Sequence, residues 1–336
     1  MKKLLNTLYI TSDGAWVHKD GANVVVSVEG VEKGRAPLQR RGAIICFGQV
    51  GVSPQLMHAA AEGGICITFL GYSGRFLARV EGPVSGNVLL RRAQHDRTTR
   101  DPLPVARAIV AAKAANQRGV IRRAIRDYGL TEPLDLAERR LSDAARLALS
   151  APDLDTLRGH EGEAAHAYFG VFDSLIRVDG MRFQGRSRRP PLDAPNALLS
   201  FLYVLLTADC RAAAESVGLD PQMGFLHRDR PGRASLALDL MEEFRAPLAD
   251  RLCLSLLNRR QIGPRDFQHQ ETGAVLLSED ARKTVLTAWQ DRKREVATHP
   301  FLAEKLPFGL FIHVQAQLLA RHLRGELDGY PAFVGK

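Results

Sequence analysis

Residues 97–104 of this chain read RTTRDPLP, and the pattern of the sequence changes at this stretch. On its N-terminal side, short runs alternate apolar and polar residues, as half-buried strands do. On its C-terminal side, long runs repeat apolar residues with the period of a helix. We therefore predict an α+β fold with a small β-rich domain at residues 1–97, a linker at 98–104 and a larger helical domain at 105–336.

The first domain is expected to hold several strands and one helix. Asp13-Gly14 and Asp20-Gly21 indicate hairpin turns, because glycine accepts the positive φ that tight hairpins require. Ser53 precedes a proline and a helical run, so it is the expected N-cap. The strands are expected at residues 8–10, 15–18, 23–29, 43–47, 65–70 and 75–80.

The second domain is expected to be almost entirely helical. No repeat of fixed period and no low-complexity tract interrupts it. The helices are expected at residues 105–128, 134–150, 161–176, 197–217, 236–259, 278–298 and 310–323.

The charge of the chain is dominated by arginine. There are 46 basic and 37 acidic residues, a net charge of +9, and only nine of the basic residues are lysine. The planar guanidinium group binds phosphate oxygens with two parallel hydrogen bonds, so this bias favours a nucleic-acid partner. A GC-rich genome that encodes arginine in place of lysine explains the bias equally well.

The cysteines and the apolar runs indicate a soluble cytoplasmic protein. Cys46, Cys66, Cys210 and Cys253 each lie in an apolar run with no C-x-x-C pair, so we expect buried, reduced thiols. No apolar core of signal-peptide length follows the first methionine. The longest apolar segment, residues 197–206, is too short to span a membrane.

A basic loop is expected at residues 180–191, GMRFQGRSRRPP. Its glycines and prolines exclude a helix. The loop is either a strap that binds phosphates or a solvated linker. Its basic residues are Arg182, Arg186, Arg188 and Arg189.

Several well-known motifs are missing. The chain has no G-x-x-x-x-G-K-[ST] and no G-x-G-x-x-G after a strand, which argues against ATP and dinucleotide chemistry. Residues 160–166, HEGEAAH, superficially resemble a zinc protease motif. The two histidines are six residues apart, however, whereas zinc proteases need histidines at i and i+4 so that both rings share one helix face.

Two carboxylates stand out in the run SLALDLMEEF at residues 235–244. Asp239 and Glu242 are three apart, so both project from one face of the predicted helix. Their apolar neighbours indicate burial, which is costly for an uncompensated carboxylate. A bound cation would compensate them.

Two further residues complete a candidate metal site. Glu161 is expected in the first turn of a helix, and His227 lies between an apolar pair and a charged turn. Carboxylate oxygens with one imidazole suit Mg²⁺ or Mn²⁺. The alternative is a structural ion-pair network in which the carboxylates are neutralised by Arg228, Arg233 or Arg245.

Several separated motifs, in order along essentially the whole chain, resemble the Cas1 family of CRISPR-associated proteins, most closely its type I-C branch. They are LRGHEGEAAHAYF from Leu157, DAPNALLSFLYVLL from Asp193, GFLHRDRPGRASLALDLMEEFR from Gly224, LNRRQI from Leu257 and QAQLLARHLRGELDGYPAF from Gln315.

The resemblance implies a different role for each of the two domains. The β-rich domain would form a homodimer, and the helical domain would bind a divalent metal, Mg²⁺ or Mn²⁺. The family motifs assign Glu161, His227 and Glu242 as ligands, with Asp239 close by in the catalytic set. Many relatives have aspartate at the second acidic position, and helical geometry leaves Glu243 as an alternative to Glu242.

The resemblance also implies a reaction and its partners. A protospacer 3′-hydroxyl would attack a phosphodiester of the CRISPR repeat, and a metal ion would polarise the phosphoryl oxygen. The same site would cleave DNA as an endonuclease when water attacks. The implied partners are double-stranded DNA and a dimer of Cas2 that bridges two dimers of this protein.

Phosphate contacts are expected from arginines around this site, independent of DNA sequence. Two other functions remain open: a structure-specific repair nuclease that acts on branched DNA, and a DNA-binding scaffold without catalysis. The first set of candidates is Arg182, Arg186, Arg188, Arg189, Arg259 and Arg260. A second set, which could instead be an ordinary solvated helix surface, is Lys113, Asn116, Gln117, Arg122 and Arg123.

Overall fold

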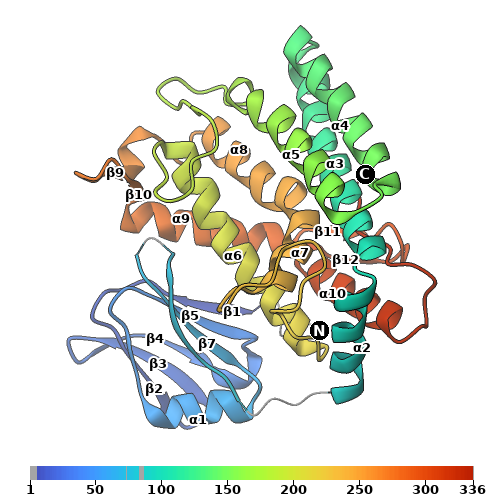
Figure 1. Cartoon of the computed structure of the whole chain (residues 1–336). Helices are drawn as coiled ribbons and strands as arrows, with labels where there is room; N and C mark the ends of the chain where they lie inside the picture. Colours follow the sequence, from blue (N-terminus) through green and yellow to red (C-terminus); the bar gives the residue numbers. More distant parts are fainter. Residues whose placement is uncertain (1–5, 73, 83–86, 336) are drawn as a thin grey trace. The chain divides into compact units, whose positions relative to one another are not determined.

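A computed structural model of the chain describes residues 6–72, 74–82 and 87–335. The chain forms two compact units. Unit 1 comprises Met1–Ser85 and Glu279–Arg294, and unit 2 comprises Gly86–Ser278 and Glu295–Lys336. Unit 1 is rich in strands and unit 2 in helices, which confirms the predicted α+β class (Figure 1).

In the part of unit 1 that the structure describes, the strands form two four-stranded sheets. In the first sheet β1, β5 and β7 run parallel and β8 is antiparallel to β7. In the second sheet β4, β3 and β2 are antiparallel and β6 runs parallel to β2. In sheet order, the strands are β1 (Thr7–Ile10), β5 (Ala43–Phe47), β7 (Cys66–Leu70) and β8 (Phe76–Val80), then β4 (Val31–Pro37), β3 (Asn23–Val28), β2 (Trp16–Asp20) and β6 (Gly51–Val52).

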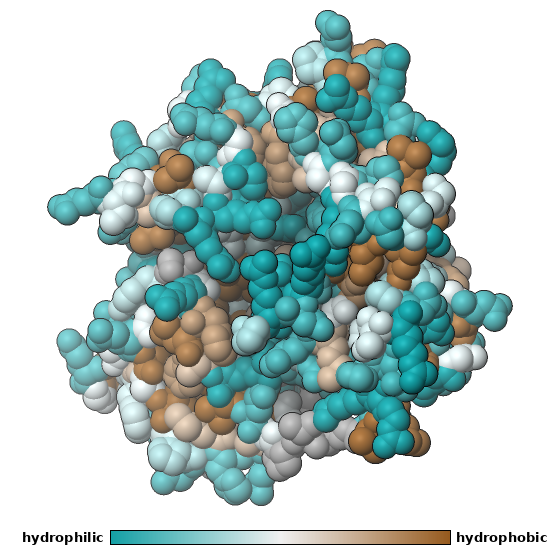
Figure 2. Space-filling view, viewed as in Figure 1, coloured by the Kyte–Doolittle hydropathy of each residue, from teal (hydrophilic) through white to brown (hydrophobic). Residues whose placement is uncertain are grey.

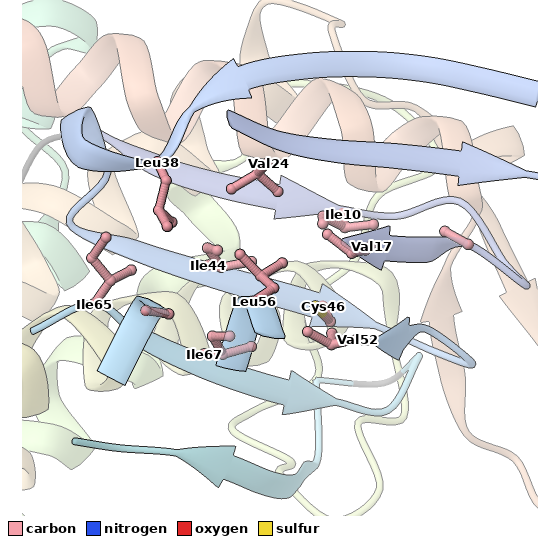
Figure 3. Close-up of a cluster of buried hydrophobic side chains, with 12 residues drawn as sticks. Ile10, Val17, Val24, Leu38, Ile44, Cys46, Val52, Leu56, Ile65 and Ile67 are labelled. Carbon is pink, nitrogen blue, oxygen red and sulfur yellow. The ribbon is translucent and has the colours of Figure 1, made fainter. Parts of the chain in front are cut away.

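The core of unit 1 consists of aliphatic side chains from both sheets and from helix α1 (Pro54–Glu62), as Figure 3 shows. Val17 and Val24 of the second sheet, Ile44 and Ile67 of the first, and Leu56 of α1 are fully buried. The alternation of the sequence directs these residues to one face of each strand.

Of the local signals predicted for unit 1, the Ser53 cap and the Asp20-Gly21 hairpin are confirmed, whereas the Asp13-Gly14 hairpin is wrong, because β1 and β2 belong to different sheets. The Ser53 side chain accepts a hydrogen bond from the backbone N–H of Leu56 and so caps α1. Gly21 has a φ of 56° in the turn between β2 and β3. The cysteines are free, although Cys66 is only half-buried whereas the other three are buried.

Two strands of unit 1 were not predicted. Strand β4 reads VEKGRAP, and nearly all of it is exposed at a sheet edge. An edge strand with polar residues on both faces has no apolar alternation to detect. Strand β6 has only two residues and is too short to show a period.

Unit 2 is built on α3, which packs against α4, α5 and α7. Helix α7 packs in turn against α6. The helices are α2 (Val88–Arg100), α3 (Leu103–Tyr128), α4 (Glu132–Ser150), α5 (Leu154–Gly170), α6 (Ala194–Ser216), α7 (Ser235–Phe244), α8 (Arg251–Asn258) and α10 (Phe311–Leu323). Two short ribbons join them: β9 (Phe267–His269) with β10 (Val275–Leu277), and β11 (Val296–Thr298) with β12 (Lys305–Pro307). A π-helical segment, Arg245–Asp250, connects α7 to α8.

The predicted linker at residues 98–104 is not a linker. Residues 98–100 end α2 and residues 103–104 begin α3, so only Asp101 and Pro102 lie between the helices. Helix α2 was missed because its sequence, VLLRRAQHDRTTR, is too polar to show a helical stripe. The two units divide between residues 85 and 86, earlier than the predicted boundary.

Helix α9 (Glu279–Arg294) belongs to unit 1, whereas the sequence placed it in the helical domain. The guanidinium of Arg282 donates a hydrogen bond to the backbone carbonyl of Tyr72, and the Trp289 side chain is fully buried. Helical period identifies a helix but does not reveal which unit it packs against.

Helix α6 is longer than its apolar run suggested. It is the one helix among the described residues with the length and apolar composition to cross a membrane. Most of its side chains are buried in unit 2, including Leu198, Leu202 and Leu206. Burial of this kind identifies the core helix of a globular unit.

We expect Ile44→Ala to destabilise unit 1 by about 2 to 5 kcal/mol, because it opens a cavity among side chains that cannot fully relax. Urea unfolding followed by tryptophan fluorescence measures this, since both tryptophans, Trp16 and Trp289, belong to unit 1. Val31→Ala, on exposed strand β4, is the control and should change stability by less than about 0.5 kcal/mol. Equal effects of the two variants would contradict this assignment of the core.

Candidate metal centre

Helix α7 places two carboxylates in the interior of unit 2, as the sequence predicted. Asp239 is 0% exposed and Glu242 is 2% exposed. The two side chains have different partners, and this difference separates their roles.

Asp239 holds the segment that carries His227. Its Oδ2 accepts backbone N–H groups from Phe225 at 2.5 Å and Leu226 at 3.0 Å. Its Oδ1 accepts the backbone N–H of His227 at 3.0 Å and lies 2.6 Å from the Nδ1 atom of the same residue. Three backbone donors and one ring donor satisfy this buried carboxylate without a metal ion.

The close approach to Asp239 requires a glycine at position 224. A Cβ atom there would lie 2.9 Å from Oδ2 of Asp239 and 2.7 Å from Cβ of Ser235. Both distances are too short for real Cβ contacts. Gly224 therefore lets the backbone of the histidine segment reach the carboxylate.

The contact with Asp239 also fixes the chemistry of His227. When Nδ1 carries the proton that it donates to Asp239, the lone pair of the neutral imidazole lies on Nε2. A carboxylate behind a histidine is the usual support for a metal-binding imidazole.

Glu161 and Glu242 converge on one cation, the ammonium group of Lys113. Its Nζ atom lies 2.6 Å from Oε1 of Glu161 and 2.9 Å from Oε2 of Glu242. We call the point that Nζ occupies between these two oxygens the shared cation position. Lys113 comes from α3, Glu161 from α5 and Glu242 from α7, and the packing of α3 against the other two helices brings the three together.

A second cation binds the other oxygen of Glu242. A guanidinium nitrogen of Arg245 lies 2.7 Å from Oε1, and the guanidinium stacks 4.3 Å from the centre of the Tyr203 ring. The sequence named Arg245 as one possible partner for the two carboxylates. In the structure, Arg245 forms an ion pair with Glu242 and not with Asp239.

The electrostatics of these groups follow from their mutual contacts. Burial disfavours the charged form of Glu242, but Arg245, Lys113 and His227 outweigh it and hold the pKa of Glu242 far below its usual value. Burial alone would lower the pKa of Lys113, yet Glu242 and Glu161 raise it above its usual value. Both groups are therefore charged at neutral pH.

Glu161 differs from expectation in its place on the helix. Helix α5 begins at Leu154, with Asp153 as its N-cap, so Glu161 lies in the middle of the helix rather than in its first turn. The dipole at a helix end therefore does not account for this carboxylate. Its partner across the helix interface, Lys113, does.

The donor set suits a divalent cation, although a lysine stands in its place. Across the described residues, no three His, Cys, Asp or Glu side chains are arranged to hold a metal ion as they stand. Two carboxylate oxygens nevertheless point at the shared cation position. Oε2 of Glu242 is buried beside the Lys113 ammonium at 2.9 Å, so this oxygen would be open to a metal ion once the ammonium moves away. The carboxylate oxygens of Glu161 and Glu242 and the Nε2 atom of His227 would hold Mg²⁺ or Mn²⁺.

Glu243 points away from this cluster. Its carboxylate accepts the hydroxyl of Tyr330, an amide N–H of Gln315 at 2.9 Å and the backbone N–H of Phe333 at 2.5 Å. Asn116 joins the same segments, because its amide donates to the backbone carbonyls of Glu243 and Phe333. The geometry therefore brings Glu242, and not Glu243, to Glu161 and Lys113.

The candidate phosphate-binding arginines divide into two groups. Arg186 is partly buried and donates to Oδ1 of Asn196 at 2.7 Å and to the hydroxyl of Ser200 at 3.2 Å, so it ties the loop to α6. The other five are exposed, and Arg182 also lies 3.3 Å from Asp173. They are Arg182, Arg188, Arg189, Arg259 and Arg260.

The second set of candidates, on α3, also divides. Lys113, Asn116 and Gln117 are at most 5% exposed, so the expectation of a solvated or DNA-facing surface is wrong for them. Arg122 and Arg123 are exposed. The signal for Lys113 was present in the sequence as a lysine among alanines, AIVAAKAANQ, on the apolar side of the helix.

The fold and the buried acidic cluster define a protein with a β-rich unit and a helical unit that gathers carboxylates and an imidazole. The family model of CRISPR associated protein Cas1 matches residues 8–291. This chain belongs to the Cas1 family.

Individual relatives agree with this assignment. A CRISPR-associated endonuclease Cas1 from Rhodospirillum rubrum is 57% identical, with all of both chains covered. Among solved structures, a Cas1 protein from Thermotoga maritima is similar with a TM-score of 0.82 and 23% identity, covering 96% of this chain and 99% of that one. A chain of a partial Cas6-RT-Cas1–Cas2 complex is similar with a TM-score of 0.64 and 25% identity, covering 98% of each chain.

The buried position of Glu243 predicts a pH dependence of stability. Burial raises its pKa from 4.5 to about 7, so the folded chain keeps a proton that the unfolded chain releases. Its contribution to the free energy of unfolding therefore falls by up to about 3 kcal/mol as the pH rises from 4.5 to 7, and is level above that. Glu243→Gln, which cannot ionise, should lose this part of the slope.

Urea unfolding followed by helical circular dichroism at several pH values between 5 and 8 measures the slope. Glu163→Gln, an exposed carboxylate on α5, is the matched control and should keep the slope of the unmodified protein. An identical slope in Glu243→Gln and the unmodified protein would show that this carboxylate does not titrate in that range.

Proposed function

We propose that this Cas1 protein is a metal-dependent DNA integrase and endonuclease that inserts protospacer DNA into a CRISPR array. The observation that carries the proposal is the convergence of Glu161 and Glu242 on one cation position, with His227 oriented by Asp239 in the same cluster. The endonuclease name of its relative at 57% identity supports the same class of chemistry. The motifs quoted above favour the type I-C branch.

The proposed reaction is a transesterification at phosphorus. The oxygen of a 3′-hydroxyl forms a new bond to phosphorus, the bond to the leaving 3′-oxygen breaks, and the proton lost by the attacking hydroxyl is balanced by the one gained by the leaving group. A bound Mg²⁺ or Mn²⁺ would polarise the phosphoryl oxygen and favour the attacking alkoxide. His227 acts as a ligand in this scheme, not as a general base, and Asp239 positions it.

The proposed partners are a second copy of this chain, a Cas2 dimer that bridges two such dimers, and double-stranded DNA. The partial Cas6-RT-Cas1–Cas2 complex supports the second of these. For the first, unit 1 offers exposed hydrophobic side chains, which Figure 2 shows gathered over the β-rich unit. The exposed large hydrophobic side chains of unit 1 include Trp16, Phe76 and Leu77. The free cysteines favour a reducing cytoplasm as the compartment.

Two alternative functions differ from the proposed one, the first in its DNA substrate and the second in needing no metal ion. A repair nuclease would cut branched DNA without Cas2 and without a repeat sequence. A non-catalytic scaffold is favoured by the Arg245–Glu242 ion pair, which compensates one carboxylate without any metal.

We expect this protein to join labelled protospacer DNA to a repeat-containing duplex. The joining reaction should require both Cas2 and a metal ion, Mn²⁺ or Mg²⁺.

We expect His227→Ala to lower strand transfer by more than about 100-fold, since it removes a ligand rather than a group that merely supports one. Dimerisation and duplex binding should change little, because the variant affects only the metal cluster of unit 2. Joining of a labelled protospacer in Mn²⁺, with sedimentation and gel-shift assays alongside, measures all three.

His166→Ala, which removes an exposed imidazole from α5, is the matched control and should retain activity. Full strand transfer by His227→Ala would refute the assignment of this histidine as a ligand.

The exposed arginines of the basic loop predict a change in salt dependence. Replacing Arg188 and Arg189 by alanine should reduce the slope of log K against log salt by about two, roughly one for each lost phosphate contact. Fluorescence anisotropy of a labelled duplex at several salt concentrations measures the slope. Replacing Arg139 and Arg146, two exposed arginines on α4, is the control for general loss of charge. An unchanged slope would identify the loop as a linker.

A further inference from the structure

Lys113 is an unusual neighbour for a metal-binding cluster. Its side chain is 6% exposed, and its ammonium group lies within 3 Å of one oxygen from each of two proposed ligands, Glu161 and Glu242. A buried ammonium is costly unless its charge is compensated, and these two carboxylates supply the compensation.

The charges of the cluster nearly balance without a metal ion. Glu161, Glu242 and Asp239 contribute three negative charges, and Lys113 and Arg245 contribute two positive ones. A divalent ion added to this set would leave one uncompensated positive charge in a buried environment, and that arrangement is unfavourable. One of the two side-chain cations therefore has to leave when a metal ion binds.

Lys113 is the cation that can leave. Arg245 binds the far oxygen of Glu242 and its planar group is stacked on Tyr203, so it does not occupy the position between the carboxylates. Lys113 occupies that position, and its ammonium sits at the end of a flexible four-carbon chain. Removal of the ammonium frees the two oxygens that would serve as ligands.

We propose that Lys113 is a resident counter-ion that fills the shared cation position in the metal-free protein and is displaced when a divalent metal binds. The inference rests on the proposed function, because the metal is the one proposed for that reaction. It assigns Lys113 two effects. The ammonium keeps the carboxylates together while no metal is present, and it competes with the metal and so weakens metal binding.

The first experiment measures Mn²⁺ binding by titration calorimetry. Lys113→Met removes the ammonium but keeps a long side chain, and we expect it to bind Mn²⁺ at least about tenfold more tightly, the scale of one charge-assisted contact. In EDTA the same variant should melt at a lower temperature than the unmodified protein, and Mn²⁺ should raise its melting temperature by more. Arg122→Met removes a charge from an exposed position on the same helix and should change neither quantity.

The second experiment uses the unmodified protein, so it does not depend on a variant that folds. Acetylation of amines, quantified by mass spectrometry, should modify Lys113 slowly in EDTA and several-fold faster in Mn²⁺, because the displaced ammonium becomes accessible. Lys19 and Lys283, both on unit 1, should react equally in the two conditions.

The outcomes distinguish the inference from the function on which it rests. Mn²⁺ binding that is no tighter in Lys113→Met, or acetylation of Lys113 that does not increase with Mn²⁺, overturns the counter-ion role and leaves the metal site intact. If the unmodified protein and Glu161→Gln both fail to bind Mn²⁺, the metal site itself is absent and both proposals fall.

Discussion

The geometry of the cluster depends on one buried carboxylate, that of Asp239. Four hydrogen-bond donors from the segment of His227 meet on its two oxygens, so the position of the histidine is set by α7 rather than by the loop that carries it. Because Glu242 lies one helical turn further along α7, the helix fixes the imidazole and the second carboxylate relative to each other. A buried charge that would otherwise destabilise the unit thereby acts as an organising element.

Three acidic residues of α7, Asp239, Glu242 and Glu243, have different hydrogen-bond and ion-pair partners. Asp239 is satisfied by backbone donors, Glu242 by cations, and Glu243 by a tyrosine, an amide and the backbone near residue 333. The difference arises from direction alone, since the three side chains leave one helix at different angles. Of the three, only Glu242 shares a cation with Glu161, whereas Asp239 positions His227 and Glu243 holds the segment near residue 333.

The sequence predicted the parts of this arrangement that depend on local pattern. Burial of Asp239 and Glu242 followed from carboxylates three apart in an apolar helix, and donor chemistry named Glu161 and His227 as candidates that the family resemblance then assigned as ligands. The sequence could not distinguish Glu242 from Glu243, because they lie about 60° and about 40° from Asp239 on opposite sides around the helix, and the sequence does not show what packs on each side. Lys113 was assigned to the surface for a similar reason. A lysine is nearly always exposed, and its partners lie 48 and 129 residues away.

The path of the chain through unit 1 has a consequence for how the molecule is made. Helix α9 completes the β-rich unit, yet it follows some 190 residues that build unit 2. During translation the strands of unit 1 are therefore synthesised first, and helix α9 follows only after most of unit 2 has been synthesised. We expect a fragment cut at the end of the N-terminal strands to be less stable than the complete unit, because it lacks that helix and its fully buried Trp289.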